Sequence, residues 1–433
     1  MANPSLQKRN VGTPDALGSW SLRTRSLRRS VWTSCDHPYV AITQTLVCWN
    51  DPGYEAGPAP DPLSSRVLVV ESGEGQARST LATVRALAAS GYRPVVAVPG
   101  ARSVVTASRY CGRTIRIPPV EHDDFRSAIE AELAAGGYLT TMVTADAALV
   151  ALGAPVGHLV DKTSLAESAN VAGLETPPAE VFETGAQLQA ATARLHYPIV
   201  VKTVFSGAPV QRIDDAVELK RVSDRSGPLL VQPFLSERLR SVAGVMWRGR
   251  LVAVIHQLYL RTWPRRCGGA CAAVSTGPVP LLEEGVTKLL QGFDGIFHAQ
   301  FSGDYLLDLN PRPYGSLPLA TRAGVNLPSL YCDLLRGAEA PPVPLRAASG
   351  YMYRWIEGEV RHVADALASR DMTLGRAAGV LRPRRRVSHG PDSITDPGPT
   401  LARLRYAAQS GKWWPRRTST TDPPDRSGAR GSG

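Results

Sequence analysis

Short apolar runs alternate with amphipathic stretches through the first well-patterned part of the chain. The apolar runs have the length and the β-branched content of buried strands, and they cover residues 66–71, 94–98, 114–117 and 139–143. Helical spacing of apolar residues follows or separates them at residues 78–90, 123–135 and 145–152. Strands that alternate with helices pack as a parallel sheet with right-handed crossovers. The pattern therefore predicts a parallel α/β domain over residues 65–157.

The pattern changes after residue 158, where short strands are joined by glycine turns. Residues 242–256 read as a hairpin around Gly249, and residues 295–309 read as a second hairpin around Gly303. Further strands are expected at 198–202 and 229–235, and helices at 161–172 and 281–290. Pro233 lacks a backbone N–H, which favours a break or an edge position for its strand. These features predict an α+β domain of antiparallel strands over residues 158–338.

The two ends of the chain differ from this body. Residues 1–64 have no sustained periodicity and end in a proline-rich linker, so we expect a disordered N-terminal extension. Residues 339–433 hold 16 basic and 9 acidic residues and account for most of the net charge of +11. We expect them to form a basic C-terminal extension with a small helical or mixed part, disordered at its end. The predicted fold class is thus α/β plus α+β, with this extension.

Composition excludes several classes of protein. The six cysteines are scattered through 433 residues, which argues against a disulfide framework, and Cys267 and Cys271 do not have a convincing metal-binding spacing. No apolar run approaches the ~18 residues needed to span a bilayer. The first 34 residues lack the apolar core of a targeting signal, so a cytoplasmic protein is expected. Arginines near the C-terminus could contact nucleic acid, but this hypothesis ranks last because Trp413 and Trp414 are nearly alone as stacking aromatics.

The candidate chemistry comes from two lysines and one hairpin. Lys162 opens a predicted helix and Lys202 ends a predicted buried strand, so both can place an ammonium group against a polyphosphate. On the second hairpin, alternate residues of a strand project from one face. The side chains expected on this face are Gln300, Asp308, Asn310 and Arg312. Amide and carboxylate oxygens suit Mg²⁺, and a guanidinium can hold a phosphoryl oxygen.

Taken together, these motifs resemble the ATP-grasp superfamily, and most closely its carbamoyl-phosphate-synthase-like branch of carboxylate–amine ligases. The motifs, in order, are Asp161-Lys162, Tyr197-Pro-Ile-Val-Val-Lys202, Leu230-Val-Gln-Pro-Phe234 and Tyr305-Leu-Leu-Asp-Leu-Asn-Pro-Arg312. The last motif is the most specific, and the resemblance covers about residues 66–335. It implies a pre-ATP-grasp α/β domain followed by an ATP-grasp domain.

The resemblance also implies roles for individual residues. ATP would be bound by Lys162, Lys202, Gln232, Pro233, Leu235 and Glu237, and magnesium by Gln300, Asp308 and Asn310. Arg312 would be catalytic, by stabilising an acyl-phosphate. The implied reaction activates a small carboxylate with ATP and joins it to an amine, so the expected partners are small molecules. Nothing in the sequence indicates the oligomeric state.

Two points stay open at this stage. Arg261, Arg265 and Arg266 are candidates to hold a substrate carboxylate, but they are equally well explained as a basic surface strand. Pro233, Arg240 and a glycine-poor loop at residues 205–209 depart from the family pattern. An ATP-binding regulatory protein without catalytic activity is therefore the alternative to a ligase.

Overall fold

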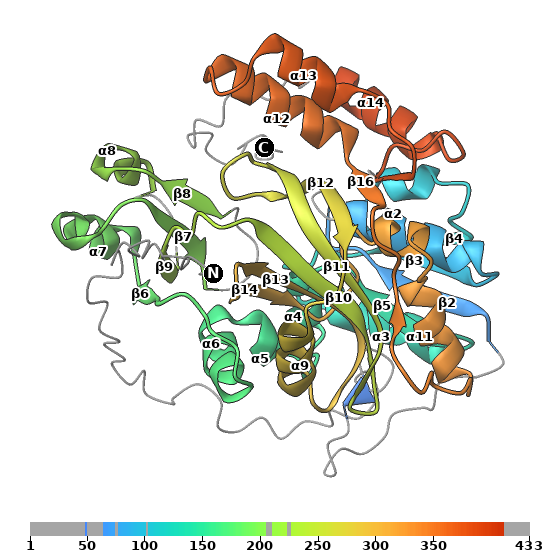
Figure 1. Ribbon diagram of the computed structural model, residues 1–433. Coiled ribbons are helices and arrows are strands. Elements are labelled where there is room, and N and C mark those ends of the chain that lie inside the picture. The colour runs from blue at the N-terminus through green and yellow to red at the C-terminus, as the bar shows by residue number, and fades with distance from the viewer. Residues whose placement is uncertain are drawn as a thin grey trace, which may run out of the picture.

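The computed structural model describes residues 48–49, 64–73, 77–100, 103–204, 210–222 and 227–410. These residues form three β-sheets with helices packed around them (Figure 1). The N-terminal sheet and the largest sheet lie side by side, and the smaller third sheet projects to the left in Figure 1. The predicted combination of a parallel sheet with antiparallel sheets is confirmed.

The first sheet is parallel and has the order β4-β3-β2-β5. Its strands are β2 (Arg66–Val70), β3 (Arg93–Pro99), β4 (Arg113–Ile117) and β5 (Thr140–Val143). The helices that connect or follow them are α2 (Ala77–Ala89), α3 (Asp124–Ala134), α4 (Asp146–Ala151) and α5 (Gly157–Val160). Val67, Leu68, Val69 and Val70 are fully buried because both faces of a parallel sheet are covered. Apolar runs alone therefore identified these strands.

The third sheet is four-stranded and has the order β6-β9-β7-β8. Its strands are β6 (Glu180–Phe182), β7 (Ile199–Thr203), β8 (Gln211–Ile213) and β9 (Leu229–Pro233), and its helices are α7 (Gly185–Ala190) and α8 (Ala216–Leu219). Of the two expectations for Pro233, the edge position is wrong, because β9 pairs with β6 and β7 on its two sides, whereas the strand does end at Pro233. Pro233 is the last residue of β9, and the next N–H, that of Phe234, donates to Pro198 O at 3.0 Å.

The largest sheet has nine strands and follows the path β1-β13-β10-β11-β12-β16-β17, with β14 paired to β13 and β15 paired to β11. Its central strands are β10 (Leu239–Trp247), β11 (Arg250–Trp263), β12 (Gly269–Thr276), β13 (Phe293–Ser302) and β14 (Tyr305–Asn310). Its outer strands are β1 (Cys48–Trp49), β15 (Leu345–Arg346), β16 (Met352–Arg354) and β17 (Val387–His389). The remaining helices are α6 (Lys162–Val171), α9 (Pro280–Leu289), α10 (Pro318–Arg322), α11 (Leu327–Leu335), α12 (Ile356–Ala368), α13 (Leu374–Leu381) and α14 (Gly398–Ser410).

Both predicted hairpins are present in this sheet, as β10–β11 and β13–β14. Strand β12 has no counterpart among the expected strands, because its glycine and three alanines have low strand propensity. Within the sheet, β12 pairs with β11 along one edge and with β16 along the other. Two of the three hydrophobic clusters contain residues from both the parallel sheet and the largest sheet, so these two sheets share their core.

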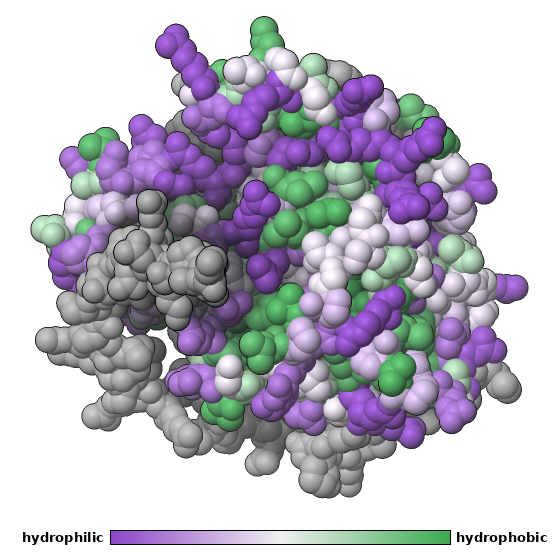
Figure 2. Space-filling model, viewed as in Figure 1, coloured by the Kyte–Doolittle hydropathy of each residue, from purple (hydrophilic) through white to green (hydrophobic). Residues whose placement is uncertain are grey.

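The C-terminal segment is built into the fold as far as residue 410. Strands β16 and β17 extend the largest sheet, and helices α12, α13 and α14 lie together at the top of Figure 1. Their surface is mostly hydrophilic in Figure 2, whereas hydrophobic residues gather over the middle of the molecule. Of the expected N-terminal extension, residues 48–49 pair with β13. The expected disorder of its remainder and of residues 411–433 concerns parts of the chain outside the described residues.

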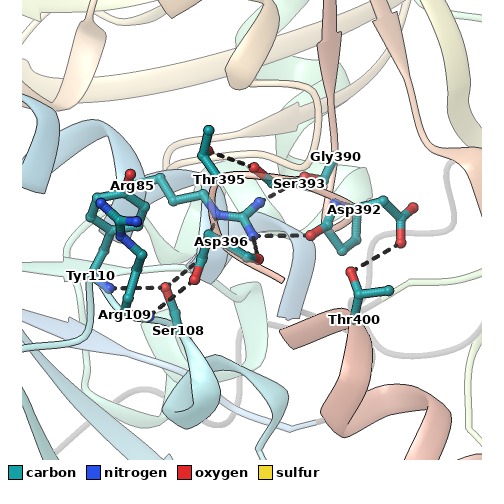
Figure 3. Close-up of polar contacts among 11 residues, drawn as sticks. Arg85, Ser108, Arg109, Tyr110, Gly390, Asp392, Ser393, Thr395, Asp396 and Thr400 are labelled. Atoms are coloured by element: carbon teal, nitrogen blue, oxygen red, sulfur yellow. Dashed lines mark hydrogen bonds and ion pairs between the residues drawn. The ribbon is translucent and has the colours of Figure 1, made fainter. Parts of the chain in front are cut away.

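A buried carboxylate fixes the end of this segment to the parallel sheet (Figure 3). Asp396 is 1 % exposed and accepts hydrogen bonds from Arg85 Nε at 2.9 Å, from Ser108 Oγ at 2.7 Å and from the backbone N–H of Arg109 at 3.0 Å. Arg85 also donates to the carbonyls of Gly390 and Pro391. One aspartate therefore joins two parts of the chain that are about 300 residues apart in sequence.

Replacing Asp396 with alanine is expected to lower the free energy of unfolding by about 2–3 kcal/mol, since it removes a charged acceptor from buried donors. Protease cleavage within residues 390–410 should become faster, because the segment loses its anchor. Chemical denaturation and limited proteolysis measure the two effects. The control is Glu130→Ala, which removes a half-exposed helix pair with Arg126 and should change stability by less than about 0.5 kcal/mol. Equal behaviour of the two variants would contradict the anchoring role.

Among the residues that the structure describes, there is no helix of sufficient length and apolarity to cross a membrane.

Candidate active site

A cavity of about 370 Å³ lies between the third sheet and the largest sheet. Its walls come from the third sheet, from strands β11, β13 and β14, and from helices α6 and α12. The predicted site residues that line it are Lys162, Lys202, Gln232, Pro233, Leu235, Glu237, Arg261, Arg265, Arg266, Gln300 and Asp308. Asn310 and Arg312 do not line it. The structure thus brings most of the predicted site together around one space.

The two lysines lie at the cationic part of the cavity. Lys162 is the first residue of α6, placed there by the Asp161 side chain, which caps the helix by accepting from the N–H groups of Thr163 and Ser164. Lys162 Nζ lies 3.7 Å from Asp308 Oδ1. Lys202 in β7 is 6 % exposed, and its Nζ donates to Leu307 O at 3.1 Å. Two ammonium groups therefore face one carboxylate across the cavity.

Burial lowers the pKa of Lys202 to about 8, since the interior disfavours the charged form; Lys162 lowers it further and Asp308 opposes the shift. The Lys202 ammonium, which the sequence resemblance assigns to an ATP phosphate, is therefore fully present well below pH 8 and is lost as pH rises through 8. ATP affinity measured by calorimetry should fall across this range. In Lys202→Arg, ATP affinity should depend less on pH, because arginine stays charged. The control Lys288→Arg, at an exposed lysine, should keep the wild-type pH dependence. An unchanged slope in Lys202→Arg would contradict this.

Several apolar residues also line the cavity. Among them are Val200, Phe234, Leu235, Leu239 and Leu307. The Phe234 ring is held in place by the Arg212 guanidinium, which lies 4.0 Å from the ring centroid. Gln232 is buried, and its Nε2 donates to Pro177 O at 3.4 Å. These groups form a hydrophobic slot beside the end of β9, of a kind that accepts a flat aromatic ring.

Glu237 is the carboxylate at the edge of this slot. Its side chain lies against Gly303 in the turn between β13 and β14, where an added Cβ would collide with the carboxylate. Gly303 has φ of +58°, a conformation that favours glycine. Ser302 Oγ donates to the Glu237 backbone carbonyl at 3.2 Å. The hairpin turn therefore positions a carboxylate at the mouth of the cavity.

Gln300 and Asp308 are directly opposite each other in the β13–β14 ladder, and both line the cavity. Asn310 follows on the same face, as the alternation predicted, but its side chain is turned away from the cavity. Its Nδ2 donates to Asp308 Oδ2 at 3.2 Å and its Oδ1 accepts from Arg312 Nη2 at 2.6 Å. Gln300 and Asp308 therefore have side-chain oxygens at the cavity wall. Asn310 lies outside the wall and hydrogen-bonds the Asp308 carboxylate.

Arg312 is 9 % exposed and forms a two-pronged ion pair with Asp146 at the start of α4, with both N···O distances 2.6 Å. Its Nη1 donates to Pro313 O at 3.1 Å. Because most of its donors are engaged in this way, the guanidinium joins the largest sheet to the parallel sheet. Its predicted contact with an acyl-phosphate stays a prediction.

The three candidate substrate arginines line the cavity but are all paired with acids. Arg261 pairs with Glu359, Arg265 with Asp365 and Asp371, and Arg266 with Asp214. Glu359 is fully buried and also pairs with Arg354. These pairs attach the tip of the β11–β12 hairpin to α12 and to the third sheet. The structure shows no free guanidinium among the three.

Sequence reasoning missed two polar groups of the cavity wall, Tyr259 and His362. Tyr259 is buried on β11, and its hydroxyl lies 3.2 Å from His298 Nε2. His362 comes from α12, in the segment expected to be an extension. Neither residue belongs to a recognisable motif, and only the folding of α12 over β11 places His362 at the site. The glycine-poor loop at 205–209 lies outside the described residues.

Comparison with known proteins relates the fold of this chain to one family model and to several solved structures. Residues 225–359 match the family described as "ATP-grasp in the biosynthetic pathway with Ter operon". No curated protein matches the chain. Among solved structures, an N5-carboxyaminoimidazole ribonucleotide synthetase in complex with ADP is similar over 82 % of this chain and 98 % of its own, with a TM-score of 0.50 and 14 % identity.

Two further structures are similar at a TM-score of 0.49 each. An L-amino acid ligase from Bacillus licheniformis is 15 % identical over 62 % of this chain and 74 % of its own. An N5-carboxyaminoimidazole synthetase from Staphylococcus aureus complexed with ADP is 17 % identical over 66 % and 80 %. Residues 225–359 therefore match an ATP-grasp family model, and the chain shares its fold with a solved ADP complex.

Proposed function

We propose that this chain is a magnesium-dependent ligase that uses ATP to activate a small carboxylate as an acyl-phosphate and joins it to an amine. The observation that carries the proposal is the single cavity that unites a hydrophobic slot, two lysines and two oxygen donors. The family match over residues 225–359 and the ligase titles of structurally similar proteins support it.

The cavity suits ATP in shape and in charge. The slot beside Phe234 and Leu235 would take the adenine, and the backbone at the end of β9 would hydrogen-bond its edge. Glu237 would accept the ribose hydroxyls. Lys162 and Lys202 would bind the phosphates, because each can place an ammonium in the cationic part of the cavity.

The donor set fits magnesium that also binds phosphate. Mg²⁺ is commonly held by one or two carboxylates together with substrate phosphates, rather than by a complete protein cage. Asp308 would supply the carboxylate and Gln300 an amide oxygen. Among the described residues, no group of three or more His, Cys, Asp or Glu side chains is arranged to hold a metal ion. The metal would neutralise charge on the transferring phosphoryl group.

The proposed reaction needs no covalent bond between the protein and the substrate. A substrate carboxylate oxygen attacks the γ-phosphorus of ATP, and ADP leaves. The amine nitrogen then attacks the acyl carbon, the bond from this carbon to the phosphate oxygen breaks, and inorganic phosphate is released. Lys162 and Lys202 hold the phosphates, and the closed apolar walls exclude water from the acyl-phosphate. Positioning and charge neutralisation supply most of the rate acceleration.

Phosphate release from ATP, followed over a panel of amino acids and other small carboxylates with and without amines, tests the proposal. Release that requires both an acid and an amine is the expected result. Lys202→Ala should lower it, since a buried phosphate contact is lost, whereas Lys288→Ala should not. Full activity in Lys202→Ala would refute the assignment of the cavity.

The second candidate is a regulatory protein that binds ATP without turning it over. The observation that favours it is the engagement of Arg312 by Asp146 and Asn310, which leaves the implied catalytic guanidinium outside the cavity wall. Tight ATP binding with no phosphate release across the whole panel would favour this candidate, and measured turnover would exclude it.

A further inference from the structure

Helix α12 contributes one imidazole to the cavity, that of His362. The residue lies beyond the segment that matches the family, which ends at residue 359. It lines the cavity together with Arg261, Thr262 and Arg265 of the β11–β12 hairpin. None of these residues has a role in the nucleotide site proposed above, which leaves this part of the wall for the acceptor.

The two ring nitrogens of His362 have different surroundings. Nδ1 lies 2.9 Å from Thr262 O on β11. Because a carbonyl oxygen can only accept, Nδ1 must carry the hydrogen, and in the neutral ring Nε2 then carries a lone pair. Among the described residues, no side chain or backbone group hydrogen-bonds Nε2. The structure therefore fixes the tautomer and leaves Nε2 available.

The ring is also held in its neutral state. Burial lowers the pKa of His362 below its usual value. Arg261 and Arg265 lower it further, while the Thr262 carbonyl and Asp365 act in the opposite direction. At neutral pH the imidazole can therefore take up a proton.

Ion pairs on both sides of His362 fix its position. Arg265 binds Asp365, one turn along α12, at 2.7 Å and Asp371 at 2.6 Å. Arg261 binds the buried Glu359, one turn back along α12. These pairs attach α12 to the tip of the β11–β12 hairpin. The helix that carries the imidazole is therefore held in place by ion pairs to the hairpin.

We propose that His362 is the general base for the acceptor amine, an inference that rests on the ligase function proposed above. Nε2 removes a proton from the acceptor's ammonium group. The nitrogen lone pair freed in this way attacks the acyl carbon, the C–O bond to phosphate breaks, and inorganic phosphate leaves. The proton stays on the imidazole until the product departs.

The other groups of the described cavity wall are less suited to this step. Asp308 lies beside Lys162 and is assigned to the metal, and Glu237 is at the mouth beside the hydrophobic slot. Burial raises the pKa of the Cys267 thiol, which disfavours its thiolate. The lysines and arginines act as cations. His362 is the one side chain there that combines a neutral base with a fixed orientation.

Hydroxylamine separates the proposed step from the activation of the acid. Its nitrogen is unprotonated at neutral pH, so it attacks an acyl-phosphate without a base and yields a hydroxamate. The test incubates ATP and an equimolar mixture of the protein amino acids with either hydroxylamine or no added nucleophile. Hydroxamate and amide products are measured for the wild type and for His362→Asn. Asparagine can still donate to Thr262 O, but it has no basic nitrogen.

His362→Asn should form hydroxamate at the wild-type rate and amide about 10²-fold or more slowly. The matched control is His158→Asn, at an exposed histidine whose Nδ1 also lies 3.0 Å from a backbone carbonyl; it should change neither product. Amide formation at the wild-type rate by His362→Asn, or an equal loss of both products, would overturn the role of His362. Absence of hydroxamate from the wild type would instead count against the ligase function, and the role would fall with it.

Discussion

Replacing Asp308 with asparagine is expected to abolish the Mg²⁺-dependent part of ATP binding and to lower turnover by about 10³-fold. The carboxylate is the one acidic group placed opposite Gln300 in the β13–β14 ladder, and it faces Lys162 in the cavity. Loss of its charge removes several kcal/mol of metal-mediated charge stabilisation, and each ~1.4 kcal/mol is worth about tenfold in rate. Calorimetric titration of ATP with and without Mg²⁺ measures the binding effect even before a substrate is known.

Asp304→Asn is the matched control. Asp304 is exposed in the turn of the same hairpin, so the same substitution there removes the same charge outside the cavity. It should leave Mg²⁺-dependent ATP binding unchanged. If Asp308→Asn kept the full effect of Mg²⁺ on ATP affinity, the metal site assigned to this hairpin would be wrong.

Replacing Arg312 with methionine is expected to lower the free energy of unfolding by about 3–5 kcal/mol, because it leaves the carboxylate of Asp146 buried without its partner. The pair is one of the few charged contacts between the largest sheet and α4, and both residues are less than 10 % exposed. Chemical denaturation measures the change. A decrease in the free energy of unfolding of less than about 1 kcal/mol, as for an exposed ion pair, would contradict the role of Arg312 in stabilising the fold.

The double variant Asp146→Leu with Arg312→Met separates structure from catalysis. Replacement of a buried ion pair by apolar side chains is often neutral, so much of the lost stability should return. Turnover is then measured on a folded protein. Turnover that returns together with stability would remove Arg312 from the catalytic set, whereas a stable and inactive double variant would keep it there.

The predictions that succeeded depend on local periodicity. Residues 66–70 are buried on both faces, so an uninterrupted apolar run was sufficient to identify β2. The period of two along β14 placed Asp308 and Asn310 on one face, while a register shift between Gln300 and Phe301 brings Gln300 opposite Asp308 rather than Leu307. Local rules were adequate here because each relation spans only a few residues.

The same rules failed where a contact partner decides the outcome. Pro233 suggested an edge strand, but its position as the last residue of β9 lets the strand lie between two others. Strand β12 is rich in small residues and forms because β11 and β16 pair with its two sides. Arg312 was expected on the same strand face, but β14 ends at Asn310, and Asp146, which lies 166 residues away in sequence, determines where its guanidinium points.

By itself, the sequence determined the alternation of strands and helices, the two hairpins and the candidate residues for a nucleotide and magnesium site. Only the tertiary structure decided which of these residues share the cavity, that all three arginines near residue 265 are paired, and that His362 from the C-terminal segment joins the wall. The reason is physical. Secondary structure follows from interactions between near neighbours, whereas the charge and orientation of a site depend on groups that folding brings together from distant parts of the chain.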